Sequence, residues 1–153
     1  MIRRFLRGAL VAALAVLPVA DAAAFSYSTA AKSNRMAALP TTWGNSAKLK
    51  IWDGGDGGTL CATFTLSATA GDSATGGTAT LTFKFTGNSA SQTVAAAAAC
   101  ASADTATITT SADVNVVTGL TVAASGADVN INNINIASGQ NVTVSGASLT
   151  HAP

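Results

Sequence analysis

The residues that could carry out chemistry in this chain are few, and nearly all of them are aspartates. The sequence has 7 acidic residues, all of them aspartate, and a single histidine, His151, close to the C-terminus. A catalytic triad or a histidine-based zinc site needs an imidazole that the fold holds firmly, whereas chain ends usually fray. Asp104, Asp113 and Asp128 lie in separate predicted turns, where aspartates usually cap the backbone or face solvent. The inventory therefore predicts a protein that is not an enzyme and has no catalytic residue.

Asp53 and Asp56 are the only candidates for a metal site. They lie in the stretch Asp53-Gly-Gly-Asp-Gly-Gly58, and alternating Asp and Gly residues occur in several calcium-binding repeats. The stretch occurs once, however, and the chain has no glutamate that could bind calcium through both carboxylate oxygens. A flexible, glycine-rich hairpin tip explains the same residues. We predict the hairpin tip and no cofactor, and keep a calcium loop at Asp53 and Asp56 as the alternative.

Cys61 and Cys100 are the only cysteines of the chain. Disulfides persist in exported proteins and are rare in the cytoplasm. A bond between the two would close a long loop and restrict the unfolded chain. We expect this disulfide if the protein is exported, and two separate buried thiols if it stays in the cytoplasm.

The N-terminus has the three parts of a secretory signal peptide. Three arginines precede an apolar run from Ala9 to Val19, and Ala20-Asp21-Ala22 or Ala22-Ala23-Ala24 supplies the cleavage pattern. The run is too short to span a bilayer. Residues 1–24 are therefore predicted to be a signal peptide-like leader, with no membrane association after its removal; an amphipathic or buried N-terminal helix is the alternative.

The remainder of the chain has the composition and periodicity of an all-β protein. Apolar and polar residues alternate in short runs, and Thr, Val and Ile favour strands. Regular turn signals between the runs favour a sandwich over a parallel sheet. The predicted strands are 48–52, 59–67, 78–86, 91–94, 106–110, 114–117 and 120–123, followed by a C-terminal hairpin that turns at 138–140.

The predicted core is the inward face of these strands. A short helix from Ala30 to Ala38 precedes them, with hydroxyl residues at its start and Pro40 just beyond its end. Trp43 is expected to cover the core from the following linker. The predicted core residues are Leu49, Ile51, Leu60, Phe64, Leu66, Leu81, Phe83, Phe85, Val129, Ile131, Val142 and Val144.

These elements predict one globular unit. Residues 25–46 form the short helix and linker, and residues 47–153 form a single antiparallel β-sandwich or jelly-roll-like domain. Charged residues make up only 10% of the chain, with a formal net charge of +1, and no Lys or Arg follows Lys84. Nucleic acid is therefore not an expected partner.

Two groups of segments resemble a family of small structural proteins from tailed-phage and prophage particles. The first is Ser125-Gly-Ala-Asp-Val-Asn-Ile-Asn132 with Ile136–Gly139, Val142–Val144 and Leu149–His151. The second is Tyr27-Ser-Thr-Ala30 with Asn34–Met36 and Lys48-Leu-Lys-Ile-Trp52. The resemblance implies a non-enzymatic virion protein, as a capsid decoration or tail component. Its implied partners are other virion proteins or copies of itself in a homo-oligomer.

The leader supports a different class of function, because tailed virions assemble in the cytoplasm. An exported bacterial β-sandwich, acting as a surface or adhesin-like protein of the periplasm or exterior, is the alternative. A carbohydrate-binding module is a third class and would need an exposed aromatic platform. Only Tyr27, Trp43 and Trp52 could provide one, and Trp52 is the best candidate because it falls on the strand face opposite Leu49 and Ile51.

Overall fold

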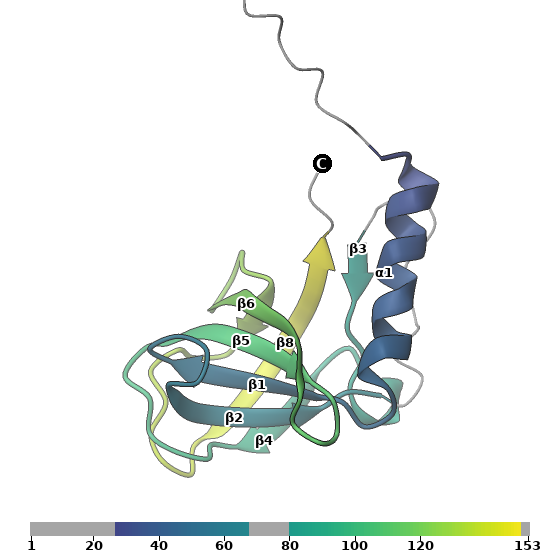
Figure 1. Cartoon of the computed structure of the whole chain (residues 1–153). Helices are drawn as coiled ribbons and strands as arrows, with labels where there is room; N and C mark the ends of the chain where they lie inside the picture. The colour runs from purple at the N-terminus through teal and green to yellow at the C-terminus, as the bar shows by residue number, and fades with distance from the viewer. Residues whose placement is uncertain (1–26, 68–79, 151–153) are drawn as a thin grey trace, which may run out of the picture.

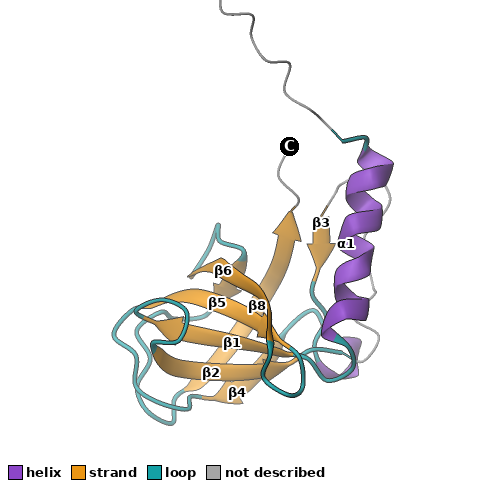
Figure 2. Cartoon of the chain, in the orientation of Figure 1, coloured by secondary structure: helices purple, strands orange, loops and turns teal. Residues whose placement is uncertain are grey.

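The structure is a computed structural model that describes residues 27–67 and 80–150. The leader, the predicted loop at 68–77 and His151 lie outside the described residues. The described chain is β-rich, with one α-helix, a 3-10 turn at Thr86–Asn88 and a curled mixed sheet (Figures 1 and 2). Across these residues, no helix is both long and apolar enough to cross a membrane.

The helix, α1, spans Thr29–Trp43 and is longer than the sequence predicts. The Ser28 hydroxyl caps its start by accepting a hydrogen bond from the Ala31 N–H at 3.2 Å. Pro40 was expected to follow the helix, but it lies inside the last turn, and the Gly44 N–H donates to the Pro40 carbonyl at 3.0 Å. Proline inside a helix removes one backbone hydrogen bond. Burial of Trp43, which is 2% exposed, offsets that cost.

The sheet has eight strands in the order β2-β1-β5-β6-β7-β8-β3, with β4 also paired to β8. Strand β8 is the longest, and it pairs with β7 on one edge and with both β4 and β3 on the other. The strand bounds are β1 Lys48–Asp53, β2 Thr59–Thr65, β3 Thr80–Thr82, β4 Gln92–Ala95, β5 Ala103–Thr109, β6 Asn115–Ala123, β7 Val129–Ile131 and β8 Asn141–Thr150.

The sheet is mixed, whereas the sequence predicted purely antiparallel pairing. Strands β6 and β7 run parallel over the short contact of Val122 and Ala123 with Val129 and Asn130. Two further strand predictions change. Residues 78 and 79 of the predicted strand 78–86 lie outside the described residues, and only Thr80–Thr82 of the described part form β3. The segments 114–117 and 120–123 form one strand, β6. Gly119 inside β6 has a φ of 73°, so the chain bends there without ending the strand.

The sheet curls until its two ends meet along a seam (Figure 1). On one side of the seam is β2. On the other are the residues that follow β4 and β3. The Ala97 N–H donates to the Cys61 carbonyl at 2.8 Å, and the Ser67 N–H donates to the Lys84 carbonyl at 2.8 Å. Leu66 and Phe85 form an isolated bridge across the same seam.

The core fills the inside of the curl. All the predicted core residues are buried except Leu60, which is half-buried. A bulge explains the exception, because Ile51 pairs with Ala62 and Trp52 pairs with Leu60, which leaves Cys61 as the extra residue. The bulge turns Cys61 inward, whereas simple alternation placed it on the face opposite Phe64. Trp43 packs edge-on against Phe83 with ring centroids 5.9 Å apart, so it covers the core as predicted.

Candidate functional site

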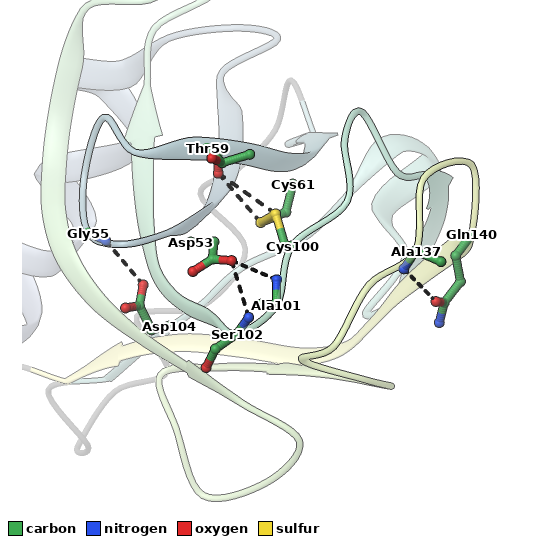
Figure 3. The surroundings of a disulfide bond; sticks show 10 residues. All are labelled: Asp53, Gly55, Thr59, Cys61, Cys100, Ala101, Ser102, Asp104, Ala137 and Gln140. Carbon is green, nitrogen blue, oxygen red and sulfur yellow. Dashed lines mark hydrogen bonds between the residues drawn. A yellow bond between two sulfur atoms is a disulfide. The ribbon is translucent and has the colours of Figure 1, made fainter.

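Three segments from distant parts of the chain meet at one end of the curled sheet. They are the β1–β2 turn (54–58), the segment after β4 (96–102) and the loop between β7 and β8 (132–140), and together we call them the disulfide end (Figure 3). The Cys100 N–H and C=O exchange hydrogen bonds of 2.8 Å with Ile136, and the Ala103 N–H donates to the Ile134 carbonyl at 2.9 Å. The end of the segment after β4 is therefore held against the loop between β7 and β8.

Cys61 and Cys100 are bonded at the centre of this end. The sulfur atoms are 2.05 Å apart, the Cα atoms are 5.8 Å apart, and the cysteines are separated by 39 residues. Their side chains are 0% and 2% exposed, so solvent reductants have little access to the bond. Because Cys61 belongs to β2 and Cys100 follows β4, the disulfide crosses the seam where the sheet closes on itself.

The two aspartates of the candidate calcium loop bind backbone groups of different neighbours. Asp53 Oδ2 accepts from the Ala101 N–H at 2.7 Å and the Ser102 N–H at 3.2 Å. Asp56 Oδ2 accepts from the Gly119 N–H at 2.9 Å. No group of three or more His, Cys, Asp or Glu residues that could hold a metal ion occurs within residues 27–67 and 80–150. These carboxylates clamp the β1–β2 hairpin to the segment after β4 and to β6.

The glycines of the β1–β2 turn make this clamp sterically possible. Gly54, Gly55 and Gly57 have φ values of 84°, 86° and 88°, a region that other residues rarely adopt. A Cβ atom at Gly58 would collide with the Asp53 carbonyl oxygen. The turn is thus a tightly folded tip whose side-chain oxygens reach the adjoining loops.

The other aspartates that the sequence placed in turns have distinct local roles, and for Asp104 that placement was wrong because it lies in strand β5. Asp104 Oδ1 accepts a hydrogen bond of 3.3 Å from the Gly55 N–H, which joins the start of β5 to the β1–β2 turn. Asp128 Oδ2 accepts from the Thr121 N–H at 2.9 Å and from the Thr121 hydroxyl at 2.8 Å. Asp128 therefore caps the turn that connects β6 to β7, as expected for an aspartate in such a position.

Asp113 belongs to a second cluster, on the outer face of β1. The ammonium groups of Lys48 and Lys50 lie 2.8 Å and 3.0 Å from the same atom, Asp113 Oδ1. Hydrogen bonds from Lys48 and then from Lys50 lower the pKa of the Asp113 carboxyl below its ordinary value. The cluster carries two positive charges and one negative charge, so it has a net charge of +1.

Trp52 completes this outer face. Its indole N–H donates to the Thr107 hydroxyl at 2.9 Å, and Lys50 Nζ lies 5.9 Å from the ring centroid. We call Lys48, Lys50, Trp52 and Asp113 the β1 outer cluster. Sequence alternation predicted the position of Trp52. It did not predict that Asp113, from the turn between β5 and β6, would join two lysines of β1.

The three aromatic residues considered for a carbohydrate platform do not lie together. Trp43 is buried in the core, and Tyr27 is 54% exposed beside the start of α1, where Arg35 lies 4.7 Å from its ring centroid. Trp52 alone remains on a sheet face with polar neighbours. Searches of protein-family models, curated proteins and solved structures found no match to this chain.

Proposed function

We propose that this protein is an exported, non-enzymatic structural module, acting as a bacterial surface or adhesin-like component. The observation that carries the proposal is the buried disulfide between Cys61 and Cys100 at the seam of the sheet. Disulfides form and persist in the periplasm and outside the cell, and cytosolic proteins rarely keep them. The leader predicted at residues 1–24 supports the same compartment.

The way the molecule is built suits a structural role. The core is built from aliphatic side chains, a few aromatic rings and several alanines, and a covalent link across the seam stabilises the fold further by restricting the unfolded chain. The chain is rich in Thr, Ser and Asn and poor in charge, so its polar faces can pack against neighbours without costly desolvation of ions. Curling brings β2 close to β4. Within this proposal, the curled sheet is a β-sandwich or jelly roll.

A structural protein of a tailed-phage particle is the second candidate function. The resemblance of the segments 27–52 and 125–151 supports it, and much of these segments folds into α1, β1, β7 and β8. In that case the protein would be a capsid decoration or tail component that contacts other virion proteins or its own copies. A disulfide can persist in a released virion, but it would have to form after the particle leaves the cytoplasm.

Mass spectrometry of the protein from its native source separates the two candidates. Export predicts a mature N-terminus created by cleavage after Ala22 or Ala24 and recovery from the periplasmic or extracellular fraction. An N-terminus that retains residues 1–24, with the protein recovered from purified particles, would contradict export and support the virion role.

A further inference from the structure

The β1 outer cluster concentrates charge on a surface that otherwise has little. Within residues 27–67 and 80–150 there are five basic residues, and two of them, Lys48 and Lys50, converge on one carboxylate oxygen. Each ammonium has three N–H donors, and Asp113 uses one donor from each. Among the residues that the structure describes, no carboxylate other than Asp113 pairs with these lysines, so the cluster keeps ammonium donors and a net charge of +1.

The indole of Trp52 leans toward these ammonium groups. The backbone partner of Trp52 on β5 is Thr105, yet its N–H bonds to Thr107, which is the partner of Lys50. The ring is thus fixed beside Lys50, and it remains half-buried, with part of its surface open. Thr107 is only 1% exposed, which agrees with a ring lying across it.

The neighbouring strand adds uncharged hydroxyl groups. Thr63 and Thr65 of β2 pair with Lys50 and Lys48, and their side chains are half-buried and exposed, respectively. An aromatic surface, two adjacent ammonium groups and flanking hydroxyls are the groups that recognise a sugar ring bearing an acid. The ring packs on the indole, the acid takes the free ammonium donors, and the hydroxyls bond to the hydroxyls of the sugar.

We propose that the β1 outer cluster is a binding site for an acidic saccharide, with the acid group bridging Lys48 and Lys50 and the sugar ring on Trp52. Asp113 holds the two lysine side chains in place before the ligand arrives, which reduces the entropy that binding must remove. The Lys50 side chain is only 16% exposed, so it is already partly ordered. Binding at this site does not depend on whether the protein is exported.

The test is calorimetric titration of the disulfide-intact protein with a galacturonate oligomer at low ionic strength, where exposed charges are least screened. Its fully methyl-esterified form is the matched neutral ligand, and a sulfated oligosaccharide distinguishes sulfate from carboxylate as the acid group. We expect saturable binding of one or both acidic oligomers and binding of the neutral ester weaker by about tenfold or more.

Variants assign the binding to the cluster. Lys48→Gln with Lys50→Gln should weaken binding of the acidic oligomer by about tenfold, and Trp52→Leu should weaken both acidic and neutral ligands by about threefold to tenfold. The matched control is Lys32→Gln with Lys84→Gln, which removes the same charge elsewhere and should leave affinity within about twofold. All four lysines are half-buried surface residues outside the hydrophobic core, so their variants report on binding even if Trp52→Leu fails to fold.

Several results would overturn the proposal. One is the absence of saturable binding to both acidic oligomers. Another is equal loss of affinity in the Lys48/Lys50 and Lys32/Lys84 variants, which would indicate attraction by net charge alone. A third is equal binding of the acidic oligomers and the neutral ester.

Discussion

The curl of the sheet has two open ends, each bordering the seam, and different contacts stabilise the two. At the disulfide end, a covalent bond ties the segment after β4 to β2, and the carboxylates of Asp53 and Asp56 accept backbone N–H groups from that segment and from β6. At the other end, which we call the helix end, α1 packs on the short strand β3 beside the last residues of β8 (Figure 1). There the main contact is between aromatic rings, Trp43 against Phe83.

Polar groups are satisfied differently at the two ends. At the disulfide end, Asp53 pairs with two backbone donors, and the Gln140 side chain accepts from the Ala137 N–H at 2.9 Å. At the helix end, the buried Trp43 indole N–H and the Ser33 hydroxyl have no partner among the described residues. Segments without an apolar core of their own are thus held by a covalent bond and paired carboxylates, whereas packing of the helix leaves two polar groups without a partner among the described residues.

A large loss of stability is expected from deleting an aromatic ring at the helix end. Phe83→Ala removes the ring that packs against Trp43 and should lower the free energy of unfolding by about 3–5 kcal/mol, the usual cost of deleting a buried phenylalanine. Urea denaturation measures it. Phe83→Leu is the control and should cost clearly less. A loss below about 1 kcal/mol for Phe83→Ala would mean that this end does not depend on aromatic packing.

The corresponding change at the disulfide end is Cys61→Ala with Cys100→Ala. Opening a loop of 39 residues should cost about 4 kcal/mol on the chain-entropy description. The same loss should appear when the natural protein is unfolded, reduced and then refolded with its thiols kept reduced. A double variant as stable as the natural protein would show that hydrogen bonds alone close the seam.

A smaller loss is expected when the clamp of Asp53 is removed. Asp53→Ala leaves the Ala101 and Ser102 N–H groups without their acceptor and should cost about 1–3 kcal/mol. Asp104→Ala is the matched control, because Asp104 makes a single bond of 3.3 Å, and its loss should be under about 1 kcal/mol.

The same clamp can be tested as a metal site. We expect a chelator to leave the melting temperature of the natural protein unchanged, because both carboxylates already bind backbone donors. A fall in melting temperature that disappears in Asp53→Asn with Asp56→Asn would restore the calcium loop as the better interpretation.

The smallest effect lies away from both ends, at Asp113. Its folded-state pKa is lowered by Lys48 and Lys50, so its contribution to stability is present above the ordinary carboxyl pKa and is lost as pH falls through the lowered value. Asp113→Asn should therefore be slightly less stable at neutral pH and equal to the natural protein in strong acid. Salt should reduce the difference, because the group is exposed. A difference that grows toward acid pH would contradict the assigned cause.

The sequence predicted what depends on local alternation and left out what depends on distant contacts. Leu49, Ile51 and Phe64 were assigned to the core by period-two spacing, and Trp52 to the outer face. Leu60 was misassigned because one extra residue at Cys61 shifts the pattern, and nothing in the local sequence marks a bulge. The end of α1 was misassigned because Pro40 usually stops a helix, and the burial of Trp43 that offsets its cost is a tertiary contact.

The candidate sites were predictable only in part. Aspartates in turns were expected to cap backbone groups, but their partners, such as Gly119 for Asp56, lie far away in the sequence. The parallel pairing of β6 with β7 and the convergence of Asp113 on two lysines arise from how the sheet curls. Cysteine count alone could not show whether Cys61 and Cys100 face each other, because that depends on the closure of the seam.

Non-reducing peptide mapping of the protein from its native source shows directly whether a disulfide joins Cys61 to Cys100 across the seam. If the seam is closed covalently in an exported protein, the digest contains one cross-linked species that joins the Cys61 and Cys100 peptides and disappears on reduction. The thiols should also resist alkylation until the protein is both unfolded and reduced. Two free thiols that alkylate on unfolding without reductant would contradict the covalent seam and remove the main support for export.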